Sequence, residues 1–283
     1  MTHPDAPPPA AAQTRQQALQ NSFNSEAGGV AAVFSGKAAD YQAARPDYPL
    51  ALLQHLRQGL PASAHVVDLG AGTGLLSAGL LQQGLRVTAV EPSPAMRSAA
   101  EQALGQEPRF ASSAGSAEAT DLAQGCADLI TAAQAFHWFD IEAARRECLR
   151  LLKPGAQVAL IWNDREREDP LQQELDALFD AFGGARRAAQ KEHMGQGDEA
   201  ERAGLPLFFG GVVPARLHWP HEHWLDEAGL ASLAFSRSYI PARASDEGQV
   251  LLGQLKRLFA RFANGPRLAM RYRTLAVIGR PAE

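Results

Sequence analysis

The sequence has few cysteines and no long apolar run, and both shortages limit what the protein can be. Cys126 and Cys148 are the only cysteines in 283 residues, so no disulfide framework is expected and a reducing compartment is favoured. No window approaches the apolar length that spans a bilayer. The first residues, "MTHPDAPPPAAAQTRQQ", lack the basic start and apolar stretch of a secretory signal. We therefore expect a cytoplasmic protein with no membrane partner.

The chain also lacks a marked excess of charge. A formal net charge of -4 argues against a dedicated nucleic-acid binder, so no nucleic-acid partner is expected. The charge is uneven, because residues 249–283 carry one acid against a basic cluster. This cluster is either the solvated face of a helix and an edge strand or a contact for an acidic substrate or partner. Its members are Lys256, Arg257, Arg261, Arg267, Arg271, Arg273 and Arg280.

Strand-like and helix-like segments alternate from His65 onward, which predicts an α/β fold with a doubly wound, Rossmann-like and mostly parallel sheet. The chain is predicted to end in an antiparallel strand over residues 270–279. Residues 1–33 are expected to form a disordered leader, followed by a single domain over 34–283. Within this domain we expect a cofactor-binding core (34–165), a helical cover (166–210) and C-terminal strands and helices (211–283).

The stretch "VVDLGAGTGL", residues 66–75, joins a buried strand to a helix through a glycine-rich turn. A dinucleotide-binding loop usually spaces its glycines G-x-G-x-x-G, so that backbone N–H groups face a pyrophosphate. Here the third glycine, Gly74, comes one residue early, and Asp68 precedes the turn. Glu91 ends the next predicted strand, where an acid binds ribose hydroxyls in this architecture. Two acids around one crevice favour a ligand that has a ribose, no phosphate and a positive charge, such as S-adenosylmethionine.

On these residues the sequence resembles the class I S-adenosylmethionine-dependent methyltransferases, in particular the small-molecule group of trans-aconitate and ubiquinone-type methyltransferases (methyltransferase type 11 domain). The resemblance covers residues 34–162 best. It implies that the chain binds S-adenosyl-L-methionine and transfers its methyl group to a small-molecule acceptor. The stretches that carry it are "FSGKAADYQAARPDYP", "VVDLGAGTGLLSAGL", "VTAVEPSPAM", "GSAEA", "ADLITAAQAFHWFD" and "LLKPGAQVALIWND".

The resemblance also implies roles for the residues around the glycine turn. Gly70 and Gly72 would lie under the methionine part of the cofactor. Asp68 would hold the cofactor's ammonium group, mainly through water. Glu91 would bind the ribose hydroxyls.

On the adenine side, the resemblance implies that Pro92 and Met96 flank the base. The family usually has an aspartate after the third strand that reads the adenine amino group, and this chain has Ser116 instead. The backbone N–H of Ala117 and the side chain of Glu118 could still serve there.

Two further regions complete the expected cofactor site. Tyr41 and Arg45 in the leader motif would fold over the pocket, although a surface helix with an Arg45–Asp47 pair would explain them equally well. Gln134, after the fourth strand, would touch the methionine end of the cofactor. The oligomeric state is expected to be a monomer or a homodimer.

The segment "QAFHWFD" follows the fourth strand, at the carboxyl end of the sheet where ligands bind. His137 is its candidate catalytic residue, either as a base or as a donor to the substrate. The alternative is a polar residue packed between Phe136, Trp138 and Phe139. The segment lacks the Asn/Asp-Pro-Pro-aromatic motif of methyltransferases that act on adenine bases or protein amides, which makes an amine or amide nucleophile less favoured.

Three histidines, His218, His221 and His223, lie on one predicted strand, but no cysteine is near and only Glu222 lies between the last two. A polar edge strand explains them better than a metal site, so no metal is expected.

The acceptor is expected to be anionic, because Arg45, Arg186, Arg187, Lys191 and the basic C-terminal cluster border the acceptor side. Arginines bind carboxylates in bidentate fashion, and the resemblance to trans-aconitate methyltransferases also favours O-methylation of a small carboxylic acid. Two alternatives remain open. One is a non-catalytic regulatory protein that binds S-adenosylmethionine, and the less favoured one is an NAD(P)-dependent oxidoreductase.

Overall fold

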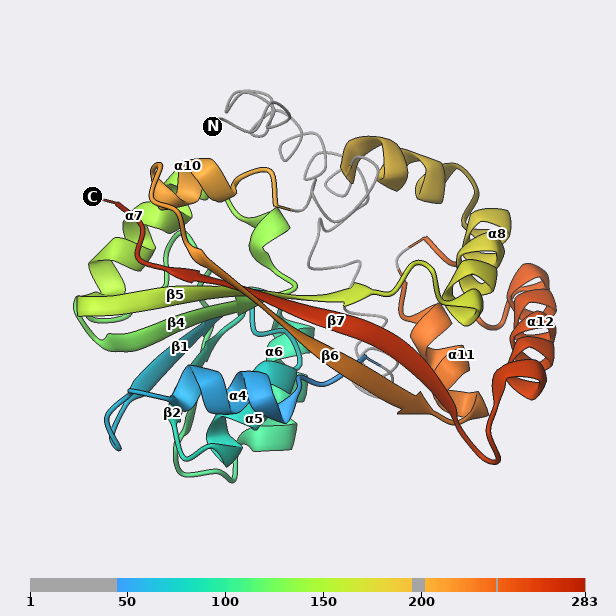
Figure 1. Cartoon of the computed structure of the whole chain (residues 1–283), viewed down its shortest axis with the longest axis horizontal. Helices are drawn as coiled ribbons and strands as arrows, with labels where there is room; N and C mark the ends of the chain where they lie inside the picture. The colour runs from blue at the N-terminus through green and yellow to red at the C-terminus, as the bar shows by residue number, and fades with distance from the viewer. Residues whose placement is uncertain (1–44, 195–201, 238, 283) are drawn as a thin grey trace.

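A single seven-stranded sheet organises the chain (Figure 1). The computed structural model describes residues 45–194, 202–237 and 239–282. The strand order is β3-β2-β1-β4-β5-β7-β6, in which β1 to β5 pair in parallel and β7 and β6 join antiparallel to β5. The expected mostly parallel Rossmann-like sheet is confirmed. The strands are β1 (His65–Leu69), β2 (Arg86–Val90), β3 (Phe110–Ser113), β4 (Ala127–Ala133), β5 (Leu152–Arg165), β6 (Ala215–Leu225) and β7 (Leu268–Gly279).

Helices cover both faces of this sheet because its central strands are apolar on both sides. In β1 every residue is buried, including Asp68, which is the only acid of the strand. The helices α4, α5 and α6 lie on one side of the sheet and α7 and α10 on the other (Figure 1). Their bounds are α4 (Leu50–Arg57), α5 (Leu75–Gln82), α6 (Pro94–Leu104), η1 (Phe136–Trp138), α7 (Ile141–Leu151) and α10 (Leu205–Phe209).

Local sequence signals place the ends of these helices. Asp140 caps α7, since its carboxylate accepts a hydrogen bond from the Ala143 N–H at 3.0 Å. Pro94 stands in the first turn of α6, where a missing N–H costs nothing. Gly84 follows α5 with a φ of 81°, a conformation that glycine adopts without strain. Each of these three ends thus follows from a local signal in the sequence.

The remaining helices gather at the far ends of the long strands β5, β6 and β7 (Figure 1). They are α8 (Pro170–Met194), α11 (Glu227–Phe235) and α12 (Asp246–Phe262). Their apolar side chains form one cluster with Leu268, Met270 and Tyr272 of β7. We call this group of three helices the cover. It packs on the end of β7 that extends beyond the core. Gly184 interrupts α8 with a φ of 51°.

The helices that pack together in the cover are not the same set as those in the predicted cover range, residues 166–210. Helix α10 falls within residues 166–210, yet Phe208 and Phe209 are fully buried in the core cluster against α7 and β5. Helices α11 and α12 fall within 211–283, yet they pack with α8. The physical reason is that apolar faces pair across the sheet regardless of their order in the chain. The predicted leader boundary at residue 34 lies outside the described residues.

Candidate active site

A cavity of about 370 Å³ opens at the carboxyl ends of β1, β2 and β4, where ligands bind in open α/β sheets. It is built from the glycine turn, the end of β2, the turn after β3 and the segment after β4. Its lining is mostly apolar, with a few polar groups among Tyr48, Asp68, Gly70, Ala71, Gly72, Thr73, Leu75, Leu76, Glu91, Pro92, Ser93, Met96, Ser116, Ala117, Glu118, Ala133, Gln134, Ala135, Trp138 and Phe139.

The glycine turn forms the floor of this cavity. Gly70 has a φ of 64°, and a Cβ at this position would lie 2.6 Å from the Cβ of Ala135. Only glycine therefore lets β1 and the segment after β4 approach so closely. Gly72 has a φ of 57°, but nothing lies within 4 Å of the position of a Cβ. Its open side faces the cavity, which leaves room for a ligand against the backbone.

Glu91 holds the turn from the end of β2. Its carboxylate accepts hydrogen bonds from the Gly72 N–H at 2.9 Å and from the Ser93 N–H at 2.8 Å. Burial raises the pKa of Glu91, and these two N–H donors oppose the rise. Each carboxylate oxygen has a second lone pair, so Glu91 can accept ribose hydroxyls while it keeps both backbone bonds.

Asp68 lies beneath the turn and is only 1% exposed. Its two oxygens accept hydrogen bonds from the Ser77 hydroxyl at 2.7 Å and from the Thr131 hydroxyl at 2.8 Å. Burial raises the pKa of Asp68 to about 6, because a carboxylate loses its hydration there. Neutral hydroxyls do not compensate the charge fully. A positively charged ligand group in the cavity, such as an ammonium group, would compensate the Asp68 charge.

The turn after β3 closes the opposite wall. The backbones of Ser116 and Ala119 pair with each other at 3.0 and 3.3 Å, so that residues 116–118 form a tight turn at the cavity. Ala117 is buried there, and a Glu118 oxygen accepts from the Asp140 N–H at 2.9 Å. Met96, also buried, lines the same end of the cavity.

The segment after β4 supplies the third wall. Gln134 has a φ of 54°, which is uncommon for a residue other than glycine. Its N–H donates to the Ile161 carbonyl at 2.9 Å and its amide Nε2 to the Asn163 carbonyl at 3.4 Å, so β5 holds this conformation. Trp138 and Phe139 then line the cavity from η1 and its end.

His137 lies on the same short helix but is not among the residues that line the cavity. Its ring packs against that of Trp138, with the centroids 4.9 Å apart. The structure therefore places it beside the site, nearer to the packed arrangement that sequence analysis gave as the alternative. Its role as a base stays a prediction.

Most residues expected to bind the cofactor meet at this one cavity. They are Asp68, Gly70, Gly72, Glu91, Pro92, Met96, Ser116, Ala117 and Gln134. Arg45 does not line it, and Tyr41 lies outside the described residues. Sequence analysis missed Tyr48, Trp138 and Phe139 as lining residues. The aromatic run in "QAFHWFD" was the only available signal for the latter two.

Comparison with known proteins agrees with this geometry. A family model described as "Methyltransferase domain" matches residues 67–160. An uncharacterized methyltransferase of Mycobacterium tuberculosis is 32% identical over 248 residues, which cover 86% of this chain and 93% of the relative. The chain belongs to the S-adenosylmethionine-dependent methyltransferase family. This assignment excludes the oxidoreductase alternative, and the chain is an enzyme whose cofactor is S-adenosylmethionine.

Other relatives are similar over shorter or more distant matches. An uncharacterized methyltransferase of Schizosaccharomyces pombe is 32% identical over 154 residues, which cover 53% of this chain and 60% of the relative. The solved structure of a putative type II methyltransferase from Anaeromyxobacter dehalogenans matches with a TM-score of 0.58 and 26% identity. It covers 83% of this chain and 97% of its own.

The residues of the methyltransferase cavity fit the cofactor. The open side of Gly72 leaves space for the ligand, and the buried carboxylates of Asp68 and Glu91 match its ammonium and ribose groups. When bound, S-adenosylmethionine supplies an activated methyl group on a sulfonium. The residues that would orient the cofactor are Asp68, Glu91 and those of the glycine turn, and the rings of Trp138 and Phe139 in the lining would limit the access of water.

The three histidines expected on an edge strand lie on β6, which is indeed an edge of the sheet. His221 contacts Asp47, with Nε2 3.0 Å from a carboxylate oxygen. In the described part of the chain, no group of three or more histidine, cysteine or acidic residues could hold a metal ion. Nor is any helix there long and apolar enough to cross a bilayer.

Proposed function

We propose that this methyltransferase acts on a small organic acid and methylates a carboxylate oxygen. The observation that supports the proposal best is a group of three arginines around one tyrosine beside the cofactor cavity. Arg165, the last residue of β5, pairs in register with Tyr272 of β7. The positive charges of Arg237, Arg165 and Arg45 all act on the Tyr272 hydroxyl, whose pKa is nevertheless raised by complete burial.

This arginine group lies near Gln134, the residue expected at the methionine end of the cofactor site. Gln134, which lines the cavity, contacts the Asn163 carbonyl. Asn163 precedes Arg165 by two residues on β5, which is about 7 Å at the usual rise of a strand. A small acid could therefore reach from the arginines to the transferred methyl group.

Arg165 keeps a donor available for such an acid. Its Nη2 donates to Asp176 of α8 at 2.8 Å. Its Nη1 is buried and has no hydrogen-bond partner among the residues that the structure describes. A buried donor without an acceptor is rare, and a carboxylate oxygen would satisfy it.

Of the cations that the sequence led us to expect at the acceptor side, Arg45 belongs to this arginine group, whereas Arg186 and Arg187 do not. Arg187 is engaged within the cover, because it binds Asp180 at 2.9 Å, Asp176 at 3.2 Å and the Tyr239 hydroxyl at 2.7 Å. Arg186 is exposed, and the side chain of Lys191 lies outside the described residues. Arg165 and Arg237 take their place in the proposal, together with Arg45.

The chemistry also favours a carboxylate. A carboxylate attacks a sulfonium methyl group without losing a proton, so it needs no general base. The ionisable side chains of the described cavity lining are Tyr48, Asp68, Glu91 and Glu118, and His137 is not among them. Asp68 and Glu91 hold the glycine turn and the cofactor, which leaves them poorly placed to deprotonate an acceptor.

A panel of acceptors, scored by release of S-adenosylhomocysteine, tests the proposal. We expect turnover of small carboxylic acids and little turnover of amines, because the guanidinium of Arg165, whose Nη1 is buried, pairs with an anion and not with a cation. Arg165→Gln should raise the acceptor KM by roughly 10- to 100-fold, as for loss of a hydrogen bond between charged groups, and leave S-adenosylhomocysteine binding unchanged. Arg271→Gln is the matched control, since Arg271 is 62% exposed on the same sheet. Turnover confined to amines or phenols would overturn the proposal.

A further inference from the structure

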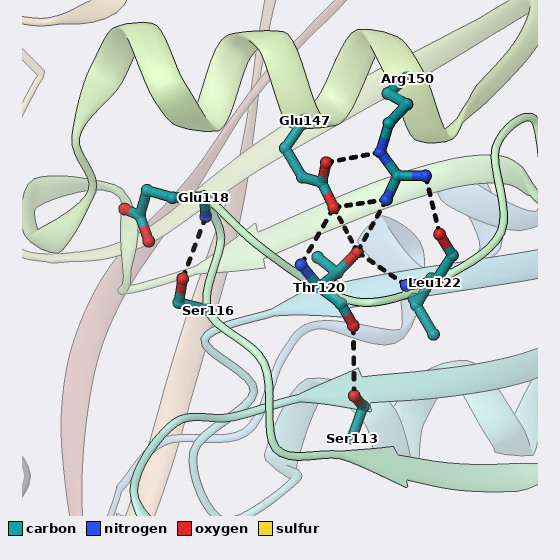
Figure 2. A network of polar contacts seen from close by, with 7 residues as sticks. All are labelled: Ser113, Ser116, Glu118, Thr120, Leu122, Glu147 and Arg150. Atoms are coloured by element: carbon teal, nitrogen blue, oxygen red, sulfur yellow. Dashed lines mark hydrogen bonds and ion pairs between the residues drawn. The ribbon is translucent and has the colours of Figure 1, made fainter.

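Next to the cavity wall formed by residues 116–118 lies a partly buried ionic network of Thr120, Leu122, Glu147 and Arg150, none of which lines the cavity (Figure 2). Its centre is Glu147 of α7, which is 8% exposed. One Glu147 oxygen accepts from both the N–H and the hydroxyl of Thr120, at 3.0 and 2.5 Å. Thr120 is fully buried and stands two residues after the 116–118 turn.

Arg150 completes this network on the next turn of α7. Its guanidinium binds both oxygens of Glu147, through Nε at 2.7 Å and Nη2 at 2.6 Å. Its third nitrogen donates to the Leu122 carbonyl at 2.8 Å. From the β3 side, the Ser113 hydroxyl donates to the Thr120 carbonyl at 3.4 Å. The loop is therefore tied at Thr120 and Leu122 from two sides (Figure 2).

The helix that carries these residues is itself immobilised in the core. Ala144, Cys148 and Leu151 of α7 are all 1% exposed or less. The start of α7 also contacts the cavity wall, because the Asp140 N–H donates to Glu118 at 2.9 Å. Helix α7 thus holds the C-terminal side of the 116–118 turn at two points, Glu118 and Thr120.

We propose that Glu147 and Arg150 are positioning residues that set the geometry of the 116–118 turn and, through it, the recognition of the cofactor's purine base. The turn presents Ser116 in place of a carboxylate, so base recognition depends on where the backbone and the short side chains stand. Gly115 brings the backbone before the turn close to the backbone after it, since a Cβ there would lie 2.8 Å from both the Ala119 carbonyl oxygen and the Thr120 Cα. A loop this tightly packed transmits a shift of Thr120 directly to Ala117.

The network should affect the adenine end of the cofactor and spare its methyl-donating end. The latter is held separately, by Asp68 with Ser77 and Thr131 and by Gln134 with β5. We therefore expect Arg150→Met to raise the KM for S-adenosylmethionine by roughly tenfold, as for loss of charge-assisted hydrogen bonds, with kcat changed less than about twofold.

The decisive measurement is selectivity for the base. S-adenosylhomocysteine and S-inosylhomocysteine differ at purine position 6, where an amino donor is replaced by an oxygen acceptor. If the 116–118 turn is correctly positioned, it distinguishes the amino donor from the oxygen acceptor at this position. The wild-type protein should therefore bind the adenosyl compound at least about tenfold more tightly. Arg150→Met should bring the two dissociation constants closer together. Arg150→Lys keeps the charge but loses the fork to Glu147 and Leu122, so its selectivity should lie between the two.

Lys153→Met is the matched control for a merely stabilising ion pair. Lys153 binds Asp128 at 2.8 Å, and the side chains of this pair are 42% and 12% exposed, against 37% and 10% for Arg150 and Glu147. The control should lower the melting temperature without changing base selectivity. If Arg150→Met unfolds, Ser113→Ala provides a milder displacement of Thr120. Equal base selectivity in wild type and in the Arg150 and Ser113 variants, or no selectivity in the wild type, would overturn the proposal.

Discussion

At the scale of single residues, the charge of the buried Asp68 is expected to govern how cofactor binding depends on pH. Its carboxylate is buried between the hydroxyls of Ser77 and Thr131, which donate hydrogen bonds but carry no charge. The pKa of Asp68 is raised to about 6, first by burial, and the neighbouring Glu91 raises it further. The free protein therefore carries a partly protonated Asp68 near pH 6, whereas a cofactor ammonium group beside it would favour the ionised form.

This predicts a pH-dependent affinity for S-adenosylhomocysteine. As the pH rises from 5 to 8, the dissociation constant should fall and level off above about 6, the pKa of Asp68 in the free protein. Because binding favours the carboxylate, protons should be released at pH 5 to 6, and calorimetry in buffers of different ionisation enthalpy detects them. Asp68→Asn should bind weakly at every pH and lack the inflection. An inflection that persists in Asp68→Asn would assign it to another group.

Single residues also show how far the site can be predicted from the sequence. Asp68, Glu91 and the glycines could be placed together at one cavity because a strand, turn and helix position them by local geometry alone. The pairing of Arg165 with Tyr272 was not, because it depends on the register of an antiparallel strand that returns over a hundred residues later. The direction of the His137 side chain was not predictable either, because it depends on the short helix η1.

At the scale of single elements, α7 does more than cover the sheet. It carries the Glu147–Arg150 pair to the loop after β3 and begins at the end of the cavity segment. Its helical span was predictable from the Asp140 cap and its apolar spacing. The function of its polar residues was not, since Thr120 and Glu147 are 27 residues apart in the chain and meet only in the folded protein.

The Glu147–Arg150 pair predicts how α7 responds to acid. Hydrogen bonding to Arg150, followed by Thr120, lowers the pKa of Glu147 to about 2 from an ordinary value of 4.5. A lowered folded-state pKa means that the ionised form contributes stability above pH 4.5, and that this contribution is lost as the pH falls towards 2. The free energy of unfolding of Glu147→Gln should thus be below that of wild type at pH 7, and the gap should narrow by pH 3. Denaturant titrations at the two pH values measure it, and a constant gap would contradict the assignment.

At the scale of the whole molecule, one face of the sheet along β5 and β7 contacts two apolar clusters, and a polar strip separates them. One cluster joins α4 and α5 to residues such as Ile161 and Ala276, and the other joins the cover to Met270 and Tyr272. Along the strands between them lie Asn163 and Thr274, whose side chains share a 2.7 Å hydrogen bond, and then Arg165. The sequence of β5 and β7 predicted strands here. It did not predict that the residues on one face of these strands change from apolar to polar and back to apolar along their length.

This division predicts that cofactor and acceptor binding can be separated by mutation. Leu255 of α12 is 1% exposed in the cover cluster, and Leu255→Ala should cost about 2–5 kcal/mol of local packing energy. The arginine group at the proposed acceptor side is held partly by the cover, through Asp176 of α8 and the stacking of Arg237 on Phe179 at 4.5 Å. Loosening the cover should therefore raise the acceptor KM.

The cofactor cavity draws its lining from the core, so Leu255→Ala should leave the dissociation constant of S-adenosylhomocysteine within about twofold of wild type, because separate sites couple weakly. The control is Leu80→Ala in α5, the helix that follows the glycine turn. Leu80 is also fully buried, and its truncation removes a similar amount of packing from beneath the turn. We expect Leu80→Ala to weaken S-adenosylhomocysteine binding, measured by calorimetry at a temperature where both variants are folded. Equal loss of cofactor affinity in the two variants would show that the cover and the core respond as one unit.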